Sequence, residues 1–305
     1  MSRPARRFAM AQWDVFSSMP LGGNSLAVFF DGRGLSDREM QSIAKEMNLS
    51  ETTFILPRDG ASAGSSHGEQ PTRVRIFTTQ EELPFAGHPT LGTAFALRGN
   101  SGAKKIVLEL KVGKVPVTFE DNAGKPAFGE MTQLDPAFVM RHDREAVARA
   151  TGLRAEDFDD KLPIETVSTG VAFTVTPLKS LAIMQKLQVD LNRAAEYLSK
   201  TAGKFFYFVT RETMDREARL HARMLFYNGE DPATGSAAGC AAAWMVAHGE
   251  AKSDERVLIE QGVEMKRASR IFVRAAHAGD ESDNRVVNVR VGGNSVEVMR
   301  GEVFL

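Results

Sequence analysis

The chain has 305 residues, of which 43% are hydrophobic and 25% are charged, so it is long enough for two domains with apolar cores. Its formal net charge of −1 gives no field that would attract nucleic acid or an anionic membrane surface. The sequence has no apolar run long enough to span a bilayer, no signal-peptide pattern and one cysteine, so we expect a cytoplasmic protein without intrachain disulfide bonds.

The first part of the chain predicts strands interrupted by one capped helix. Aromatic and β-branched residues predict strands at Phe8–Phe16, Leu26–Phe30 and Leu49–Leu56. Ser36 and Glu39 form a capping-box pattern that begins a helix, which we expect Asn48 to end. Residues 58–72 are rich in Gly, Ser and Ala and predict a surface loop, in which His67 would be solvated.

The stretch Arg75–Leu97 predicts a strand, an acidic turn and a helix. From Pro89 onward, small and apolar residues recur at helical spacing, and Gly99 would form the C-cap. The Ala-Gly-His-Pro corner therefore lies at a helix N-terminus. Because the first N–H groups of a helix lack intrahelical partners and carry the positive end of its dipole, this corner could hold an anion such as a carboxylate.

The remaining chain is again rich in predicted strands. Lys104–Phe119 predicts two β-rich runs broken at Val112-Gly113-Lys114. Two helices are expected, Asp143–Ala150, stopped by Gly152, and Asp190–Lys200. Further strands are predicted at Phe128–Leu134, on both sides of Ser168-Thr169-Gly170, and at Phe205–Thr210, Val257–Glu260, Ile271–Arg274, Arg285–Val291 and Ser295–Phe304.

A second copy of the central stretch occurs at Arg223–Val246. With one gap in the turn, four residues of the first copy fall opposite four of the second: Arg75, Ala86, Gly92 and Ala94 opposite Arg223, Ala233, Gly239 and Ala241. We interpret the chain as two related halves, each presenting a helix N-terminus to a ligand. Two halves, each a strand barrel around one helix, fit this order of elements better than a doubly wound βαβ sheet.

Four motifs, found in order over nearly the whole chain, resemble the PhzF family of phenazine biosynthesis-like isomerases with the diaminopimelate epimerase-like fold. They are Asn24-Ser25-Leu26-Ala27-Val28, Asn48-Leu49-Ser50-Glu51-Thr52-Thr53-Phe54, Pro84-Phe85-Ala86-Gly87-His88-Pro89-Thr90-Leu91-Gly92 and Asp231-Pro232-Ala233-Thr234-Gly235-Ser236-Ala237-Ala238-Gly239.

The resemblance implies an α+β fold of two pseudo-symmetric halves, each a barrel-like β-sheet wrapped around a central helix. We expect residues 1–115 to form the N-terminal half, with a final strand at about 295–305 returning to it, and residues 116–294 to form the other half. The resemblance also implies an active-site cleft between the halves, a homodimer, and a cofactor-free isomerisation of a small carboxylate such as trans-2,3-dihydro-3-hydroxyanthranilate.

The resemblance also assigns roles to site residues. Glu51 would be the acid/base that moves a proton on the substrate, which is chemistry that a single carboxylate can perform. His88 and Asp231 would bind and orient the substrate. Backbone N–H groups near Gly87 and near Gly235-Ser236 would receive its carboxylate.

Each of these residues also has a purely structural interpretation. Glu51 could be a surface carboxylate between a helix and a strand, and His88 or Ser236 could cap a helix. Asp231 before Pro232 is a common turn-forming pair. A non-catalytic small-molecule-binding or interaction protein on the same fold is the alternative function, but it would not need a carboxylate placed for proton transfer.

Other chemistries fit the sequence less well. A two-thiol epimerase needs a cysteine at each helix N-terminus, whereas Cys240 lies a turn inside the second helix. The segment Gly235–Gly239 is out of register for G-x-S-x-G, and Gly229–Ser236 lacks the lysine of a phosphate loop. The six histidines show no metal-ligand spacing, so we expect no metal site.

Overall fold

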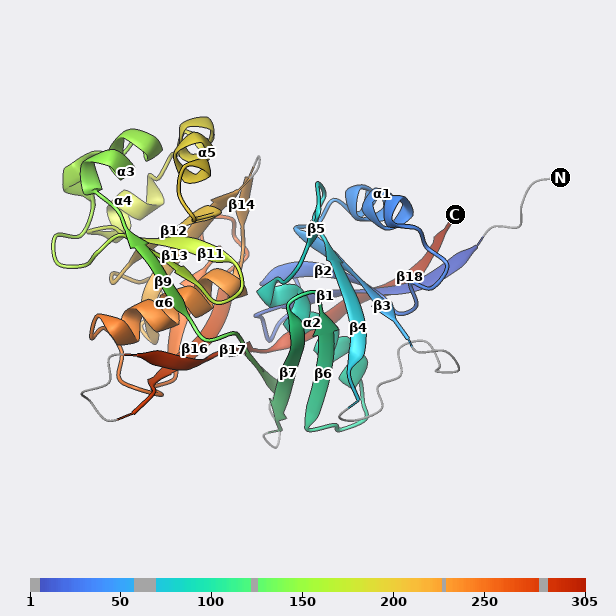
Figure 1. Ribbon diagram of the computed structural model, residues 1–305. Helices are drawn as coiled ribbons and strands as arrows, with labels where there is room; N and C mark the ends of the chain where they lie inside the picture. The colour runs from blue at the N-terminus through green and yellow to red at the C-terminus, as the bar shows by residue number, and fades with distance from the viewer. Residues whose placement is uncertain (1–5, 58–69, 122–125, 227–228, 280–284) are drawn as a thin grey trace. The chain divides into compact units, whose positions relative to one another are not determined.

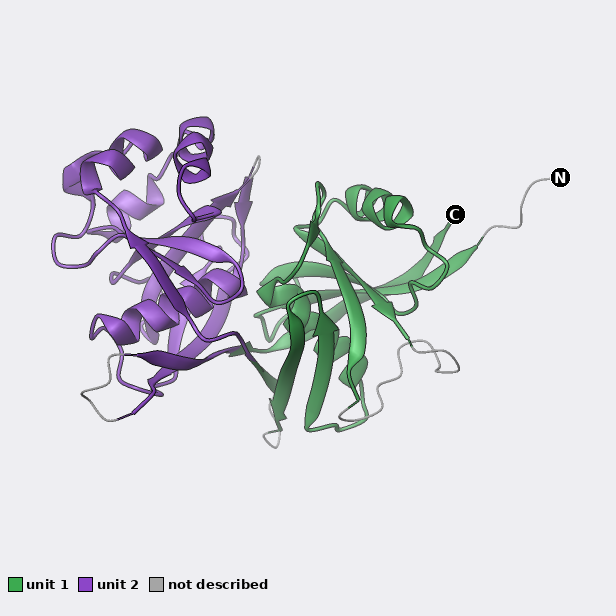
Figure 2. Cartoon of the chain, viewed as in Figure 1, with its two compact units in different colours: residues 1–131, 292–305 green, residues 132–291 purple. Residues whose placement is uncertain are grey.

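The computed structural model describes residues 6–57, 70–121, 126–226, 229–279 and 285–305 (Figure 1). The chain forms two compact units, residues 1–131 with 292–305 and residues 132–291 (Figure 2). Residues 58–69 of the predicted loop, including His67, lie outside the described residues.

The first unit is a mixed sheet whose strands run in the order β18-β1-β2-β3-β4-β6-β7-β8, with β5 paired to β4. The β2–β3 and β4–β6 pairs are parallel and the others are antiparallel. Its strands are β1 (Arg7–Val15), β2 (Asn24–Phe29), β3 (Glu51–Leu56), β4 (Thr72–Phe77), β5 (Glu82–Leu83), β6 (Lys105–Leu110), β7 (Gly113–Glu120), β8 (Phe128–Thr132) and β18 (Ser295–Phe304).

Helix α2 (Gly87–Arg98) is the central element of this unit, because every one of its residues is buried. It contacts β1, β2, β3, β6, β7 and β18, so the sheet wraps around it. Gly92 permits the close approach, since a Cβ at this position would lie 2.6 Å from side-chain atoms of both Leu26 and Val15. The helix therefore packs closely against β1 and β2 at Gly92.

Helix α1 (Asp37–Met47) precedes β3 and positions its first residue. The predicted capping box between Ser36 and Glu39 is confirmed, and Asn48 forms a left-handed C-cap with φ of 52°. Met40, Ile43 and Ala44 bury one face of the helix. The chain turns sharply at Asn48 and enters β3 at Glu51.

The second unit repeats this arrangement with strands β9 (Ala137–Arg141), β10 (Glu165–Ser168), β11 (Ala172–Pro177), β12 (Phe205–Thr210), β13 (Ala218–Phe226), β14 (Gly229–Asp231), β15 (Val257–Gln261) and β16 (Ser269–His277), followed by β17 (Val286–Gly293). Its helices are α3 (Arg144–Thr151), α4 (Leu181–Gln185), α5 (Leu191–Ser199) and α6 (Gly235–Ala247), with a 3₁₀ turn at Ala155–Asp157. The buried helix α6 contacts β10, β11 and β16.

The two units share one pattern of strand pairing, although their sequences differ. From β18 to β7, neighbouring strands are antiparallel, antiparallel, parallel, antiparallel, parallel and antiparallel. The order β9-β10-β11-β12-β13-β15-β16 gives the same succession. The predicted α+β fold of two pseudo-symmetric halves, each a sheet around a central helix, is therefore confirmed.

Candidate active site

Glu51 and His88 lie together in the first unit. Glu51 is the first residue of β3, opposite Leu26 of β2, and its exposed fraction is 8%. His88 is the second residue of α2 and is 2% exposed. The two side chains face each other with Nε2 of His88 3.4 Å from Oε2 of Glu51. The structural interpretation of Glu51 as a surface carboxylate is therefore wrong.

The helix that carries His88 begins earlier than its sequence predicts. The sequence predicts helical spacing from Pro89 onward, but α2 begins at Gly87, with Ala86 as its N-cap. Proline is tolerated at the third position because no N–H of the first turn has an intrahelical partner. His88 is consequently not the helix cap, and its side chain is available to the site.

The electrostatic state of His88 follows from its burial. Burial lowers its pKa to about 3, against an opposing hydrogen bond with the Ser25 backbone. The ring is therefore neutral near pH 7. The Asn24 side-chain nitrogen lies 3.1 Å from Nδ1, whereas Nε2 makes no hydrogen bond to any residue that the structure describes. A buried polar atom of this kind is typical of a place where a ligand or reacting group completes the bonding.

Asp231 lies in the second unit, at the end of β14 and with 3% of its surface exposed. Its Oδ2 accepts a 2.6 Å hydrogen bond from the Thr234 hydroxyl. The corner between Asp231 and α6 is held by Gln261 of β15, whose side-chain nitrogen donates to the Asp231 carbonyl oxygen at 2.8 Å and to Thr234 Oγ1 at 2.9 Å. Gln261 Oε1 accepts from the Thr234 N–H and from the Tyr207 hydroxyl, both at 3.1 Å.

Sequence reasoning missed Gln261 and Asn24 as parts of these sites. The available signal for Gln261 is a fully buried amide at the end of the apolar strand β15. The signal for Asn24 is its place at the head of the first family motif, where its role was not assigned.

Gly235 and Ser236 are the first two residues of α6, and both are buried. Thr234 is the N-cap, so the interpretation of Ser236 as the helix cap is wrong. The Gly235 carbonyl oxygen accepts a 3.0 Å hydrogen bond from the Gln133 side chain, which secures the start of the helix. The second unit thus presents a buried helix N-terminus directly after Asp231.

Strand register shows that the Glu51 carboxylate is not duplicated in the second unit. Phe54 pairs with Arg75 and Phe208 pairs with Arg223, so the counterpart of Glu51 is Phe205. The pairs Leu26 with Glu51 and Phe173 with Phe205, at the start of the two parallel strand pairs, agree with this assignment. The repeat therefore supplies one carboxylate at this position, which favours a single acid/base over two matched ones.

Cys240 does not fit a two-thiol mechanism either. It lies inside α6 with none of its surface exposed, as the sequence indicates, and its sulfur contacts the Thr169 hydroxyl at 3.5 Å. Burial raises the pKa of the thiol to about 11, so little thiolate forms at neutral pH.

Across the described ranges, no group of three or more His, Cys, Asp or Glu side chains is arranged to hold a metal ion. None of the described helices is both long enough and apolar enough to cross a membrane.

Known proteins resemble this chain over most of its length. The family model for phenazine biosynthesis-like protein, PhzC-PhzF, matches residues 13–301. The chain is 36% identical to trans-2,3-dihydro-3-hydroxyanthranilate isomerase of Pseudomonas aeruginosa, over 96% of this chain and 98% of that protein.

Solved structures show the same relationship. A PhzF-family phenazine biosynthesis protein of Bacillus anthracis superposes with a TM-score of 0.84 at 26% identity, over 98% of this chain and all of that chain. A hydroxyproline epimerase of Agrobacterium vitis shares the fold, with a TM-score of 0.65 at 11% identity over 100% of this chain and 93% of that chain. The chain therefore belongs to the phenazine biosynthesis-like PhzC-PhzF family, and it is an isomerase of that family.

Proposed function

We propose that this protein is a cofactor-independent isomerase that moves a proton between two carbons of a small carboxylate-bearing compound, with Glu51 as the acid/base. The observation that carries the proposal is the buried contact between Glu51 and a neutral His88, 3.4 Å apart at the start of the central helix. A carboxylate shielded from water and placed beside a neutral partner is suited to accept a proton from carbon.

The proposed step conserves all atoms of the substrate. Glu51 removes a proton from one carbon, and the electron pair of that C–H bond forms a new double bond. The existing double bond then shifts and its far carbon takes the proton back from Glu51. Because the same carboxylate performs both transfers, the step needs no second acid/base, which agrees with the single carboxylate of the repeat.

We propose trans-2,3-dihydro-3-hydroxyanthranilate, or a related cyclic amino carboxylate, as the substrate class, on the basis of the similarity to the Pseudomonas aeruginosa isomerase. His88 and Asp231 orient the substrate. N–H groups at Gly87, Gly235 and Ser236 bind its carboxylate. Gly87 lies in the first turn of α2, and Gly235 and Ser236 lie in the first turn of α6. Both helices are buried, and the dipole at a helix N-terminus favours an anion.

The experiment is proton NMR of the purified protein in D₂O with trans-2,3-dihydro-3-hydroxyanthranilate, beside Glu51→Gln. We expect substrate signals to disappear as deuterium enters the ring, at a rate that falls by about 10²–10⁴-fold in the variant. Glu46→Gln, at an exposed carboxylate of α1, is the matched control and should behave as the wild type. Substrate binding without deuterium exchange in the wild-type protein would instead favour a non-catalytic small-molecule binder.

If this compound is inert, a screen of small cyclic and amino carboxylates for deuterium exchange tests the wider substrate class. Deuterium exchange that depends on Glu51 with any of these compounds supports the proposed mechanism, and exchange unaffected by Glu51→Gln contradicts it.

We further propose that the protein works as a homodimer in the cytoplasm. Light scattering of the purified protein at micromolar concentration tests the dimer.

A further inference from the structure

Thr234 is an N-cap residue whose hydroxyl does not cap its helix. It precedes α6, yet its side chain makes no capping hydrogen bond to that helix. The N-cap side chains of α1, α3, α4 and α5 all accept a hydrogen bond from a first-turn N–H of their own helix. The N-cap of α2 is Ala86, whose side chain has no polar atom. Among the α-helices that the structure describes, the two central ones, α2 and α6, are therefore the ones without a side-chain cap.

The orientation of the Gln261 amide explains why the Thr234 hydroxyl is turned away from α6. One amide atom of Gln261 lies 3.1 Å from both the Thr234 backbone nitrogen and the Tyr207 hydroxyl oxygen. Since a backbone N–H can only donate, this atom is the amide oxygen, and the other is the nitrogen. The nitrogen lies 2.8 Å from the Asp231 carbonyl oxygen and 2.9 Å from Thr234 Oγ1. Thr234 Oγ1 therefore accepts a hydrogen bond from Gln261.

The hydrogen of the Thr234 hydroxyl consequently points at Asp231. A hydroxyl has one hydrogen to donate and two lone pairs that can accept. Because Gln261 donates to one lone pair, the hydrogen is directed to Asp231 Oδ2, which lies 2.6 Å away. That distance is typical of a hydroxyl that donates to a carboxylate. Asp231 is 3% exposed and Thr234 is 6% exposed, so both ends of this hydrogen bond are shielded from water.

The backbone between Asp231 and Thr234 is held by the segment that follows β15. The Ser269 hydroxyl donates to the Pro232 carbonyl oxygen at 2.8 Å. Gly262, with φ of 76°, approaches the same oxygen so closely that a Cβ at this position would lie 2.5 Å from it. Because the backbone is held in this way, the Thr234 hydroxyl donates to Asp231 from a fixed place.

We propose that Thr234 is a positioning residue, whose hydroxyl holds the Asp231 carboxylate in its substrate-binding orientation and leaves the first N–H groups of α6 to the substrate carboxylate. This inference rests on the proposed function, in which Asp231 orients the substrate and N–H groups at the start of α6 bind its carboxylate. A Thr234 hydroxyl in the ordinary capping position would accept from the second or third N–H of the helix and compete for the Ser236 N–H. Gln261 prevents this competition, because it directs the hydroxyl to Asp231.

The first test reads the hydrogen-bond direction without substrate. It uses ¹H–¹⁵N spectra of the ¹⁵N-labelled full chain at pH 7, in which the side-chain amide of Gln261 is assigned through its own backbone signals. Thr234→Val removes the hydroxyl with little change of shape, and Thr234→Ser retains it. Thr176→Val is the control, because Thr176 is a fully buried threonine of the same unit whose hydroxyl donates elsewhere, to the Thr174 carbonyl oxygen at 2.9 Å.

We expect both amide protons of Gln261 to lie downfield in the wild type, Thr234→Ser and Thr176→Val, since each proton has an acceptor. In Thr234→Val, one of the two protons should move upfield because its acceptor is gone, while the proton bonded to the Asp231 carbonyl oxygen should stay. Gln261 amide signals in Thr234→Val that match the wild type would overturn the inference. If Thr234→Val does not fold, Thr234→Ala is judged by the same criterion.

Kinetics separate this inference from the proposed function. With an active substrate, Thr234→Val should raise KM by about 3–30-fold and change kcat by less than about 3-fold, because a ground-state binding contact is weakened. Thr234→Ser should restore KM to near the wild-type value, and Thr176→Val should not change it. Absence of turnover in every protein, including the wild type, would contradict the proposed function but leave the amide result standing. Glu51-dependent turnover with an unaltered KM in Thr234→Val would contradict only the role of Thr234.

Discussion

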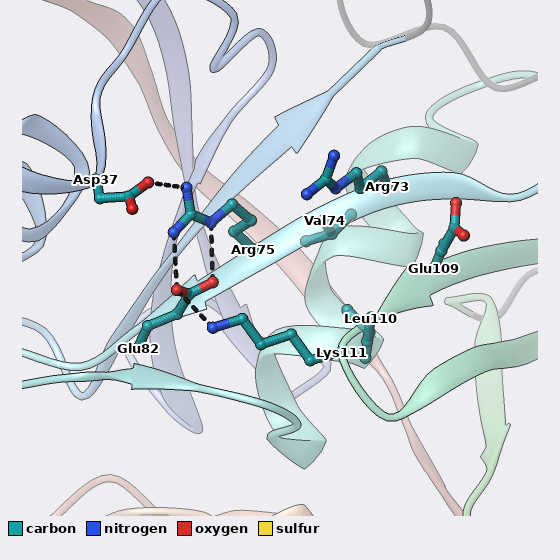
Figure 3. Close-up of a pocket in the computed structure, with 8 residues that line it drawn as sticks. All are labelled: Asp37, Arg73, Val74, Arg75, Glu82, Glu109, Leu110 and Lys111. Atoms are coloured by element: carbon teal, nitrogen blue, oxygen red, sulfur yellow. Dashed lines mark hydrogen bonds and ion pairs between the residues drawn. The ribbon is translucent and has the colours of Figure 1, made fainter.

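Arg75 and Glu82 form a bidentate ion pair across the β4–β5 hairpin, with Nε to Oε1 at 2.8 Å and a terminal guanidinium nitrogen to Oε2 at 2.7 Å (Figure 3). In the second unit, Arg223 and Glu230 make the same pair across the β13–β14 hairpin, at 2.9 and 2.7 Å. Each arginine precedes its glutamate by seven positions. The pair therefore belongs to the repeated structural unit, since each of these hairpins leads into a central helix.

The ion pair predicts a measurable contribution to stability. Glu82→Gln should lower the free energy of unfolding by about 1–3 kcal/mol, because both side chains are mostly buried and Arg75 would lose a charged acceptor. Arg75, Glu82 and Glu109 line one surface pocket (Figure 3). Glu109→Gln, at the exposed carboxylate of this pocket, is the control and should change the free energy of unfolding by less than about 0.5 kcal/mol. Urea unfolding of the three proteins measures both values, and equal losses in the two variants would contradict the role of the pair.

Short-range patterns in the sequence predicted much of the fold because helix caps depend on neighbouring residues. Ser36 with Glu39, and Asp143 with Gly152, begin and end helices as their sequences indicate. Strand β9 was not predicted because all five of its residues are exposed, so burial imposes no alternation on its sequence. The short helix α4 was also not predicted, since five residues are too few to establish a helical period.

The candidate site was only partly predictable for a related reason. The family motifs brought out Glu51 and His88, and their proximity in the structure supports that pairing. The bonds that hold such residues in place join positions far apart, as between Asn24 and His88 or between Gln261 and Asp231. Contacts between such distant residues cannot be predicted from local sequence patterns, because the neighbours of a residue in the chain do not indicate which distant residue it will contact.

Gln261 predicts a separable effect on substrate binding. Gln261→Leu should lower the free energy of unfolding by about 2–4 kcal/mol, because it leaves the Thr234 N–H and the Asp231 carbonyl oxygen without this partner in a buried place. If Asp231 binds substrate, KM should rise more than kcat falls. Tyr207→Phe, which removes one hydrogen bond to the same amide, should cost only about 1 kcal/mol and leave KM nearly unchanged. A Gln261→Leu protein with unaltered KM would show that this corner does not affect substrate binding.

Cys240 predicts a negative result for thiol chemistry. Cys240→Ala should keep nearly full turnover, because the thiol is completely buried and its pKa, raised by burial to about 11, leaves little thiolate at pH 7. Iodoacetamide should modify the native protein much more slowly than the urea-unfolded chain, as mass spectrometry would show. Loss of turnover in a Cys240→Ala protein with wild-type melting behaviour would restore a thiol to the mechanism.

His221 predicts a pH dependence of stability in the second unit. Burial alone would lower its pKa, but hydrogen bonds to Glu260 at 2.8 Å and to Glu264 at 3.0 Å outweigh burial and raise it to about 9. Since the folded pKa lies above the ordinary value of 6.5, protonated His221 stabilises the fold fully below about pH 6.5, and this contribution is lost as the pH rises through about 9.

His221→Gln measures that contribution. The advantage of the wild type over His221→Gln in free energy of unfolding should be largest near pH 6, at about 1–3 kcal/mol, and should shrink steadily toward pH 10. His88→Gln provides the opposite case, because burial depresses the pKa of His88 to about 3. Any titration contribution from His88 is therefore present above pH 6.5 and is lost as the pH falls toward 3. Urea unfolding of the wild type and His221→Gln at five pH values between 5 and 10 tests the pH dependence predicted for His221. A wild-type advantage in free energy of unfolding that grew with pH would show that His221 is neutral in the folded protein.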